Sequence, residues 1–409
     1  MITHWIFGSS IWTAALGICA ISIITGGFIL PAAITILHQR FWYDRILRKR
    51  YNAAYNPRCS IILPCKGVPE NLETNLKAFL DLAYVNFEII FTVESEEDLA
   101  FSSISRLITP YPKASVVVAG KAAQCGQKNF NQLAAIKNAK VPDVYVFADI
   151  DICPQKQWLN ELVLPLSNKK ITAVTGFRWN RPAHETMGEY VHTYLNIFLY
   201  IWMTTINFFG GAFLWGGSMA IRKKDFEDLK VAECWKHAVV DDNSLSRILM
   251  KKLKRTVVVP ACVTATDDLL ASVSKSIFWF TRQVMYLKAH EKPLWFFGAL
   301  PLVLIAFFLY TWLPLSLVLS AGSAKTFFNM GGGATLIFYA GGLFIVPLFP
   351  VLGPLPGLYK MFFIEPLLRF TIVISLFKTA VTNKIIWSGI KYHLTFSGTV
   401  AKVERLDGN

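Results

Sequence analysis

The sequence predicts an α/β domain that is held at a membrane by apolar segments before and after it. Apolar residues make up 54% of the 409 residues and are concentrated in a few long runs, which is typical of integral membrane proteins. Between about residues 57 and 288, short β-like runs alternate with helical spacing, which favours a mostly parallel sheet with crossover helices. Acidic residues follow the ends of several predicted strands, where ligands bind in sheets of this kind.

The charge and the cysteines restrict the partners and the compartment. The chain has a net charge of +14 and seven cysteines. It contains no basic motif with interleaved aromatic residues, so we expect no nucleic acid partner. Membrane topology and anionic lipid headgroups explain the positive charge better. The cysteines show neither metal-ligand spacing nor a disulfide framework, which fits a reducing cytosolic face.

Residues 1–50 are predicted to be a membrane anchor and its basic flank. Residues 11–37 contain no charge and are long enough to cross a bilayer. A cleaved signal peptide is the competing interpretation, but this run is too long, and the basic residues follow it instead of preceding it. Those residues are Arg40, Arg45, Arg48, Lys49 and Arg50. By the positive-inside rule, they place the following domain on the cytoplasmic face.

Residues 51–290 form the predicted cytoplasmic domain. The predicted strands cover residues 59–64, 87–93, 115–119, 144–148, 171–176 and 255–260. The predicted helices cover residues 71–82, 130–140, 276–288, and a stretch from about 241 towards 254.

Residues 190–221, inside this domain, are apolar and rich in aromatic residues. A transmembrane span is possible there. Two glycine pairs, Gly210-Gly211 and Gly216-Gly217, interrupt the run, so we favour a membrane-interfacial helix. Such a segment is suited to line the path of a lipid-borne substrate.

Residues 291–409 are predicted to return to the membrane. Residues 295–319 and 332–356 are two expected spans, and 357–380 is expected to be an interfacial helix in which Glu365 and Arg369 pair at i,i+4. The tail then stays cytoplasmic. The prediction is a multi-pass protein of a bacterial inner membrane or of a Golgi or endoplasmic reticulum membrane, with its central domain on the cytoplasmic face.

Two carboxylates end the buried run 144–148. Asp149 and Asp151 are two residues apart, so in an extended segment both side chains point the same way. Same-facing carboxylates repel each other unless a cation neutralises them. Mg²⁺ or Mn²⁺ is the natural partner, and such ions usually also hold substrate phosphates. A polar turn stopped by Pro154 is the simpler alternative.

Four other positions complete a set suited to transferring a group away from a nucleotide diphosphate. Arg282 adds a fixed positive charge for the leaving diphosphate, and Lys128 is placed to reach a phosphate or anchor the donor. Asp242 takes the proton of the attacking hydroxyl group. At least one residue of the acidic run that contains Glu94 and Asp98 contacts the donor.

Each of these residues also has an ordinary interpretation. Asp242 follows an apolar pair at the start of a helix, where aspartate is most often only a cap. Basic residues such as Arg282 gather at cytoplasmic membrane interfaces. Lys128 suits a solvated helix face, and most acidic runs are solvated loops.

The order of the motifs resembles that of family 2-type nucleotide-sugar glycosyltransferases, and more closely the ceramide glucosyltransferase family with its bacterial members. The matching stretches are Pro64–Gly67, Asn71–Leu76, Phe87–Phe91, Glu97–Ala100, Gly126–Leu133, Phe147–Asp151, Val174–Gly176, Asp241-Asp242, Thr281–Gln283 and Ile386–Tyr392. The resemblance implies a GT-A fold, in which a Rossmann-like mixed sheet binds a nucleotide-diphospho-sugar. It also implies a UDP-sugar donor, a divalent metal, inversion at the anomeric carbon and a lipid acceptor such as ceramide.

The resemblance also gives roles to residues. Asp242 corresponds to the catalytic base, and Asp149 and Asp151 to the metal ligands. The donor-binding positions are Glu94, Asp98, Lys128, Asp149, Asp241, Arg282 and Gln283. The first aspartate of the family, near the uridine, falls at about Ser95, so a neighbouring acidic residue must replace it.

The late motif departs from the family pattern, because Gln283 follows Arg282 where processive synthases have tryptophan. That absence favours one transfer to a lipid, with glucose as the first candidate sugar. A processive polysaccharide synthase of the same superfamily is the alternative, although the predicted spans are too few for a channel. A transporter or a non-catalytic membrane protein is a third class, but transporters usually show more spans and repeat symmetry.

Overall fold

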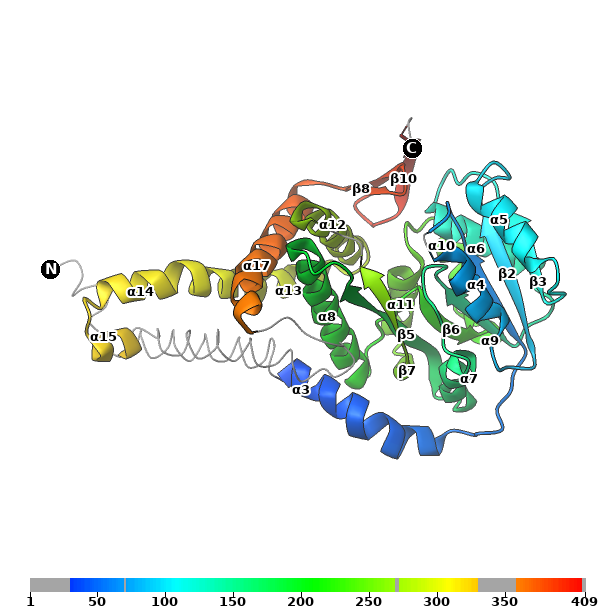
Figure 1. The fold of residues 1–409 in the computed structure, drawn as a ribbon, viewed down its shortest axis with the longest axis horizontal. Coiled ribbons are helices and arrows are strands. Elements are labelled where there is room, and N and C mark those ends of the chain that lie inside the picture. Colours follow the sequence, from blue (N-terminus) through cyan, green and yellow to red (C-terminus); the bar gives the residue numbers. More distant parts are fainter. Residues whose placement is uncertain (1–29, 70, 269–271, 330–357, 407–409) are drawn as a thin grey trace.

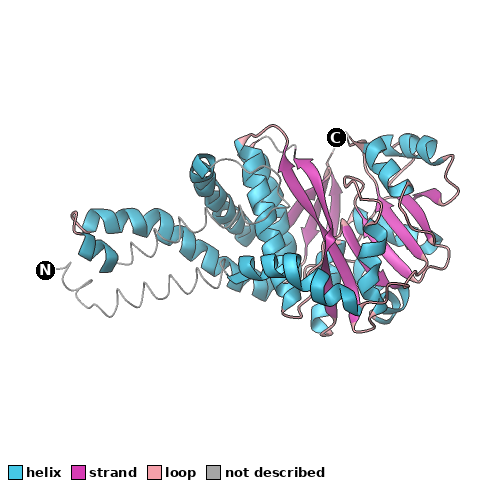
Figure 2. Ribbon diagram, turned by 60° about the horizontal axis from the view of Figure 1, so that its bottom comes forward, coloured by secondary structure: helices cyan, strands magenta, loops and turns pink. Residues whose placement is uncertain are grey.

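The computed structural model describes residues 30–69, 71–268, 272–329 and 358–406 (Figure 1). Its centre is a seven-stranded sheet in the order β3-β2-β1-β4-β6-β5-β7, with helices on both faces (Figure 2). The strands are β1 (Cys59–Pro64), β2 (Phe87–Val93), β3 (Ala114–Val118), β4 (Val144–Ala148), β5 (Ile171–Pro182), β6 (Ser218–Arg222) and β7 (Arg255–Asp268).

The first half of the sheet is parallel. β1 pairs with β2 and with β4 in parallel registers that start at Cys59. Its side chains alternate between the two faces: Ile61 and Leu63 lie in one core cluster, whereas Ile62 lies in another. The first face is covered by α4 (Leu72–Leu80), α5 (Leu99–Ile108) and α7 (Trp158–Val163). The second is covered by α6 (Gln127–Asn138), α9 (Lys223–Asp228), α10 (Val231–Trp235) and α11 (Asp241–Lys251).

The second half of the sheet is mixed. β6 lies antiparallel between β4 and β5, and β5 runs parallel to β7. Both β5 and β7 are longer than predicted, because their pairing continues past a register shift between Thr175 and Phe177. Gly176 makes this shift possible, since a Cβ there would lie 2.2 Å from the carbonyl oxygen of Cys262.

The structure corrects the interpretation of residues 190–221 as one interfacial segment. Residues up to 208 belong to α8 (Met187–Phe208), which begins with a capping box of Thr186 and Glu189. Most of α8 is buried against β5, β7 and other helices. Residues 218–221 belong to β6, inside the sheet. Within residues 190–221, the large apolar side chains that are exposed are those of Phe208 and Phe209, where the helix ends.

Further helical elements lie before and after the sheet, apart from η4, which precedes β5, and α13, α14 and α15 project away from the sheet in Figure 1. They are α3 (Leu30–Leu37), η2 (His38–Leu47), η3 (Arg48–Arg50), η4 (Leu164–Ser167), α12 (Val273–His290), α13 (Lys292–Phe307), η5 (Phe308–Trp312), α14 (Leu313–Leu319), α15 (Ala324–Asn329) and α17 (Leu358–Val381). The predicted pair on α17 is confirmed, with Arg369 Nε 2.6 Å from Glu365 Oε1.

The predicted membrane spans are not confirmed. Among the helices that the structure describes, none combines the length and the apolar character needed to cross a bilayer. Residues 295–319 are helical in three successive segments, α13, η5 and α14. Most of the predicted span 11–37, and all of the span 332–356, lie outside the described residues.

The residues of the predicted tail form a folded part of the domain. Residues 384–405 form a three-stranded antiparallel sheet of β8 (Lys384–Trp387), β9 (Ile390–Leu394) and β10 (Val400–Arg405). It is held in place by a core cluster that joins Ile385 and Tyr392 to Val240 and to Tyr286 of α12. We call this sheet the C-terminal sheet. It lies above the carboxyl edge of the central sheet (Figure 1).

Candidate active site

The carboxyl edge of the parallel strands carries the site. Asp149 follows directly after β4, and its amide donates to the carbonyl oxygen of Gly217 at 3.2 Å. This bond ties the turn with both predicted metal ligands to the start of β6. Next to it is a cavity of about 510 Å³, at the edge where ligands bind in sheets of this kind. Its charged lining residues are Lys66, Lys128, Asp149, Asp151, Arg178 and Arg282.

Lys128 is the centre of a buried ion network. Its Nζ lies 2.8 Å from Asp149 Oδ1 and 3.2 Å from Asp241 Oδ2, and it donates to the carbonyl oxygen of Gly216 at 3.3 Å. Burial alone would lower the pKa of Lys128, but Asp149, Asp241 and Asp242 together raise it above its ordinary value. Lys128 is therefore charged at neutral pH and holds three elements together.

Lys128 reaches this position because α6 begins earlier than predicted. The predicted helix started at residue 130, whereas α6 starts at Gln127 and is capped by Gly126. A Cβ at Gly126 would lie 2.1 Å from the carbonyl oxygen of Val239. Only glycine allows α6 to start so close to the segment before α11.

The two aspartates that begin α11 have different surroundings. Asp241 is fully buried, and its Oδ2 accepts a hydrogen bond from Gln132 Nε2 at 2.7 Å. It is thus a structural partner of Lys128. Asp242 is partly exposed, and its Oδ2 accepts from the amide of Gly216 at 2.9 Å. Burial, followed by the charge of Asp241, raises the pKa of Asp242 to about 6.

Gly216 joins the predicted base to the cavity. Its carbonyl oxygen accepts from Lys128, which lines the cavity, and its amide donates to Asp242, which does not. A Cβ at this position would lie 2.7 Å from Asp241 Oδ2. At Gly217 a Cβ would lie 2.6 Å from Asp149 Oδ2. Glycine is therefore required at both positions because a side chain would overlap the carboxylates of Asp241 and Asp149. The sequence pattern alone did not give this reason.

Asp149 and Asp151 are each matched by a cation. Asp151 forms an ion pair with Arg178 of β5, and Arg178 also lies 5.8 Å from the ring of Trp215. Burial raises the pKa of Asp149, but Lys128 and Arg178 outweigh it and hold that pKa below its ordinary value. Asp149 is therefore ionised. No sequence pattern singled out Arg178, whose role depends on the unpredicted extension of β5.

These two aspartates fit a divalent ion that shares substrate phosphates. Oδ1 of Asp151 is buried and has no hydrogen-bond partner within the described part of the chain. No group of three or more His, Cys, Asp or Glu side chains is placed to hold a metal there either, as far as the described ranges extend. Mg²⁺ and Mn²⁺ bound to phosphates commonly use one or two carboxylates, so a third protein ligand is not required.

The C-terminal sheet forms one wall of the cavity. Its lining residues there are Trp387, Ser388, Ile390 and Tyr392. Arg405 of β10 pairs with Glu94 at 2.6 Å and donates to Gln127 Oε1 at 3.1 Å. Glu94 therefore lies beside the N-terminus of α6, although it is not among the lining residues. The Ile386–Tyr392 motif was the sequence signal for this wall, whereas nothing pointed to Arg405.

Three further residues that were predicted to bind the donor, Arg282, Gln283 and Asp98, differ in whether they line the cavity. Arg282 of α12 lines the cavity and lies 5.4 Å from the ring of Trp387. Gln283 does not line it. Asp98 caps α5 by accepting from the amide of Ala100 at 2.9 Å, and it accepts from Gly67 at 2.8 Å. The structure gives Asp98 a structural role, and its contact with a donor stays a prediction.

A second hollow adjoins the cavity through Arg282. It has a volume of about 340 Å³ and is lined by one face of α12, by Ser274, Lys275, Phe278, Trp279 and Arg282. Phe278 is more than half exposed. An apolar surface thus begins where the charged cavity ends, and a molecule with a polar and an apolar part could contact both.

Comparisons with known proteins bear on the family and on the fold. The model of a family described as glycosyl transferase family 21 matches residues 25–400. The chain is 26% identical to ceramide glucosyltransferase 1 of Caenorhabditis elegans over 154 residues, which cover 36% of this chain and 33% of that protein. It is 25% identical to ceramide glucosyltransferase 3 of the same organism over 178 residues, 42% of this chain and 38% of that one.

The match to curated relatives is partial, whereas one structural match is nearly complete. The chain spans about a third of the length of the curated relatives it matches. A mannosyltransferase from Pyrobaculum calidifontis, solved in complex with GDP-Man and Mn²⁺, superimposes with a TM-score of 0.54 over 90% of this chain and 99% of that chain, at 15% identity. At this identity the likeness shows the fold alone, and it supports the predicted GT-A-like mixed α/β sheet.

Proposed function

Because the chain belongs to glycosyl transferase family 21, we propose that it transfers a hexose, with glucose as the first candidate, from a UDP-sugar to a hydroxyl group of a membrane lipid such as ceramide. The chain is a family 2-type glycosyltransferase related to ceramide glucosyltransferases. The observation that carries the proposal is the network of Lys128, Asp149 and Asp241 beside a cavity at the carboxyl edge of the sheet, with Asp242 attached through Gly216.

The donor occupies the cavity in this proposal. Lys128 and Arg282 face the diphosphate, and their fixed charges stabilise the negative charge that develops on the leaving oxygen. Asp149 and Asp151 would hold Mg²⁺ or Mn²⁺, which supplies further positive charge on the phosphate oxygens. The mannosyltransferase of similar fold was solved with GDP-Man and Mn²⁺, which supports a nucleotide-sugar donor and a divalent metal for this chain.

The transfer is a single displacement. The acceptor hydroxyl group gives its proton to Asp242 as its oxygen bonds to the anomeric carbon, and the bond from that carbon to the diphosphate oxygen breaks. UDP leaves from the opposite face, so the anomeric configuration inverts. A pKa of about 6 keeps Asp242 mostly unprotonated at neutral pH and still basic enough to accept the proton.

The acceptor is proposed to lie against the hollow on α12. Phe278 and Trp279 suit a lipid chain, while Arg282 belongs to both the hollow and the cavity. The names of the curated relatives support a ceramide-like acceptor. We also propose that the chain is anchored by the apolar residues 11–37 and 332–356, with the α/β domain on the cytoplasmic face. Extraction of membranes with alkaline carbonate would release the protein if this anchoring were wrong.

The test is turnover of the full chain in lipid nanodiscs with a panel of radiolabelled UDP-sugars and candidate lipids, with and without Mn²⁺. Wild type should yield a labelled lipid, and Asp242→Asn should lower kcat by about 10²–10⁴-fold because it removes the base. Asp228→Asn, at an exposed aspartate that does not line the cavity, is the matched control and should leave kcat unchanged. A labelled polymer, or equal activity of Asp242→Asn and wild type, would contradict the proposal.

A further inference from the structure

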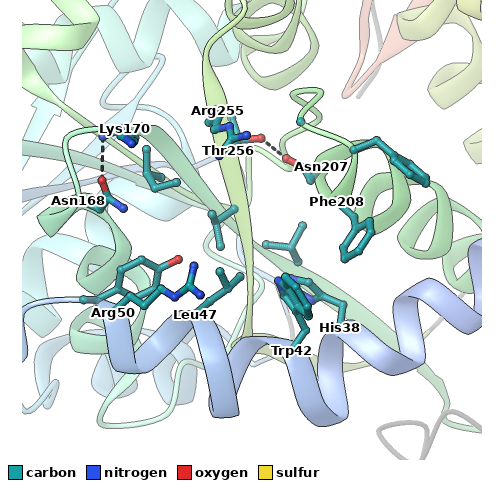
Figure 3. A pocket seen from close by; sticks show the side chains of 16 residues that line it. His38, Trp42, Leu47, Arg50, Asn168, Lys170, Asn207, Phe208, Arg255 and Thr256 are labelled. Carbon is teal, nitrogen blue, oxygen red and sulfur yellow. Dashed lines mark hydrogen bonds between the residues drawn. The ribbon is translucent and has the colours of Figure 1, made fainter.

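A larger cavity, of about 610 Å³, lies at the opposite edge of the central sheet, where β5 and β7 begin. Figure 3 shows its walls. His38, Trp42, Leu47 and Arg50 rise from the helical segment η2–η3 along one side, and Lys170 and Arg255 lie across from them. Phe208, at the end of α8, closes a third side. No residue of this cavity belongs to the site described above.

The charges of this cavity are all positive. Arg50, Lys170 and Arg255 line it and are exposed, and none of its described lining residues is acidic. Within the described residues none of the three forms an ion pair. The sheet brings two of them together, because Ile171 of β5 is in register with Arg255 of β7. Unmatched cations that converge on one hollow are suited to bind an anion.

The rim of the cavity is aromatic and exposed. Trp42 and Phe208 have ring centroids 6.0 Å apart, and Phe209 continues the patch. The three side chains are 42%, 41% and 71% exposed. Exposed Trp and Phe next to Lys and Arg are typical of protein surfaces at the boundary between lipid headgroups and acyl chains.

One buried polar group also points to a ligand. His38 lines the cavity, is only 5% exposed, and its Nδ1 has no hydrogen-bond partner in the described part of the chain. Buried polar atoms in folded proteins are nearly always hydrogen-bonded. A ligand oxygen in the cavity would supply the missing partner.

We propose that this cavity binds the phosphate headgroup of an anionic membrane lipid. The phosphate lies between Arg50, Lys170 and Arg255, and the apolar chain of the lipid leaves along Trp42 and Phe208. The bound lipid is distinct from donor and acceptor, and the inference does not depend on the transfer reaction.

The test measures binding of three soluble probes to the full chain by calorimetry in uncharged detergent. The probes are short-chain phosphatidylglycerol, short-chain phosphatidylcholine and glycerol 3-phosphate. Wild type should bind phosphatidylglycerol more tightly than the other two. The variant Arg50→Gln/Lys170→Gln/Arg255→Gln should lose about a hundredfold in affinity for it, because each basic residue contributes attraction to an anionic lipid.

The matched control is Lys137→Gln/Lys140→Gln/Lys224→Gln, which removes three exposed charges outside the cavity. It should keep the affinity of wild type, and both triple variants should keep the wild-type thermal unfolding midpoint, which verifies their fold. Trp42→Ala/Phe208→Ala should weaken binding of phosphatidylglycerol but not of glycerol 3-phosphate. Equal losses in the two triple variants would overturn the proposal. Equal affinity for phosphatidylglycerol and phosphatidylcholine would also overturn it. If glycerol 3-phosphate bound as tightly as phosphatidylglycerol, the ligand of the cavity would be a soluble phosphate and not a lipid, which would overturn the proposal as well.

Discussion

The two edges of the central sheet use positive charge in opposite ways. At the carboxyl edge, Lys128 is paired with Asp149 and Asp241, and Arg178 is paired with Asp151. At the amino edge of β5 and β7, Lys170 and Arg255 face a cavity that has no acidic side chain among the lining residues that the structure describes.

This difference corresponds to two roles of a cation, which are to fix the geometry of a site and to bind an incoming anion. A buried cation that is matched by carboxylates has a fixed position, because removing either partner leaves an uncompensated charge away from water. An exposed, unmatched cation costs little to desolvate and remains available to an incoming anion. The first arrangement suits chemistry that needs fixed geometry, and the second suits attachment to a surface.

The largest expected difference between the edges is in stability. Lys128→Met removes the cation that lies between the buried Asp241 and the partly exposed Asp149, and should lower the free energy of unfolding by about 3–5 kcal/mol. Lys170→Met, the same change at the exposed edge, should alter it by no more than about 0.5 kcal/mol. Guanidinium denaturation of both variants checks this, and equal stability of the two would remove the basis of the comparison.

The pH dependence of turnover tests whether Asp242, at the carboxyl edge, is the group that takes the proton. Asp242 acts as a base only when it is unprotonated, and its pKa is raised to about 6 instead of the ordinary value near 4. The value of kcat/KM should therefore fall about tenfold per pH unit as pH decreases below about 6. A profile that stays flat down to pH 5 would show that another group takes the proton. Lipid binding at the amino edge, which depends on Lys and Arg, should not change over this range.

The smallest effect is expected where a pair is only partly buried. Arg405 and Glu94 lie 2.6 Å apart, with side chains 31% and 14% exposed. Arg405→Gln should raise KM for the UDP-sugar about two- to fivefold and leave kcat unchanged, because such a pair contributes at most about 1 kcal/mol. Lys402→Gln, an exposed change on the same strand, is the control. A loss of kcat in Arg405→Gln would mean that Arg405 contributes to the chemical step.

The parallel half of the sheet could be predicted from the sequence because each strand is a short, mostly apolar run. The predicted strand at residues 87–93 and the observed β2 have the same bounds. The run before Asp149 is likewise buried on both faces. The aspartates at its end then had to lie at the carboxyl edge, since parallel strands end together.

The mixed half could not be predicted in the same way. β6 is a short apolar strand inside an apolar and aromatic stretch, so hydrophobicity alone does not distinguish it from the end of α8. Its antiparallel position between β4 and β5 depends on contacts across the sheet. The ion partners Arg178 and Arg405 come from strands whose length or existence was missed, so neither could be connected to Asp151 or Glu94.

The C-terminal sheet has a consequence for the order in which the protein becomes functional during synthesis. Arg405 contacts Gln127 across 278 positions of the chain. At the same helix start, the hydroxyl oxygen of Tyr392 accepts a hydrogen bond from the amide of Gln127 at 3.2 Å. When the ribosome has translated α12, every carboxylate of the site has therefore been synthesised, but the C-terminal sheet that forms one wall of the cavity has not. Contacts of such long sequence separation form late in folding. The nascent chain thus emerges with an open, unfinished pocket, and its ability to hold a nucleotide should arise only when β10 is released and docks.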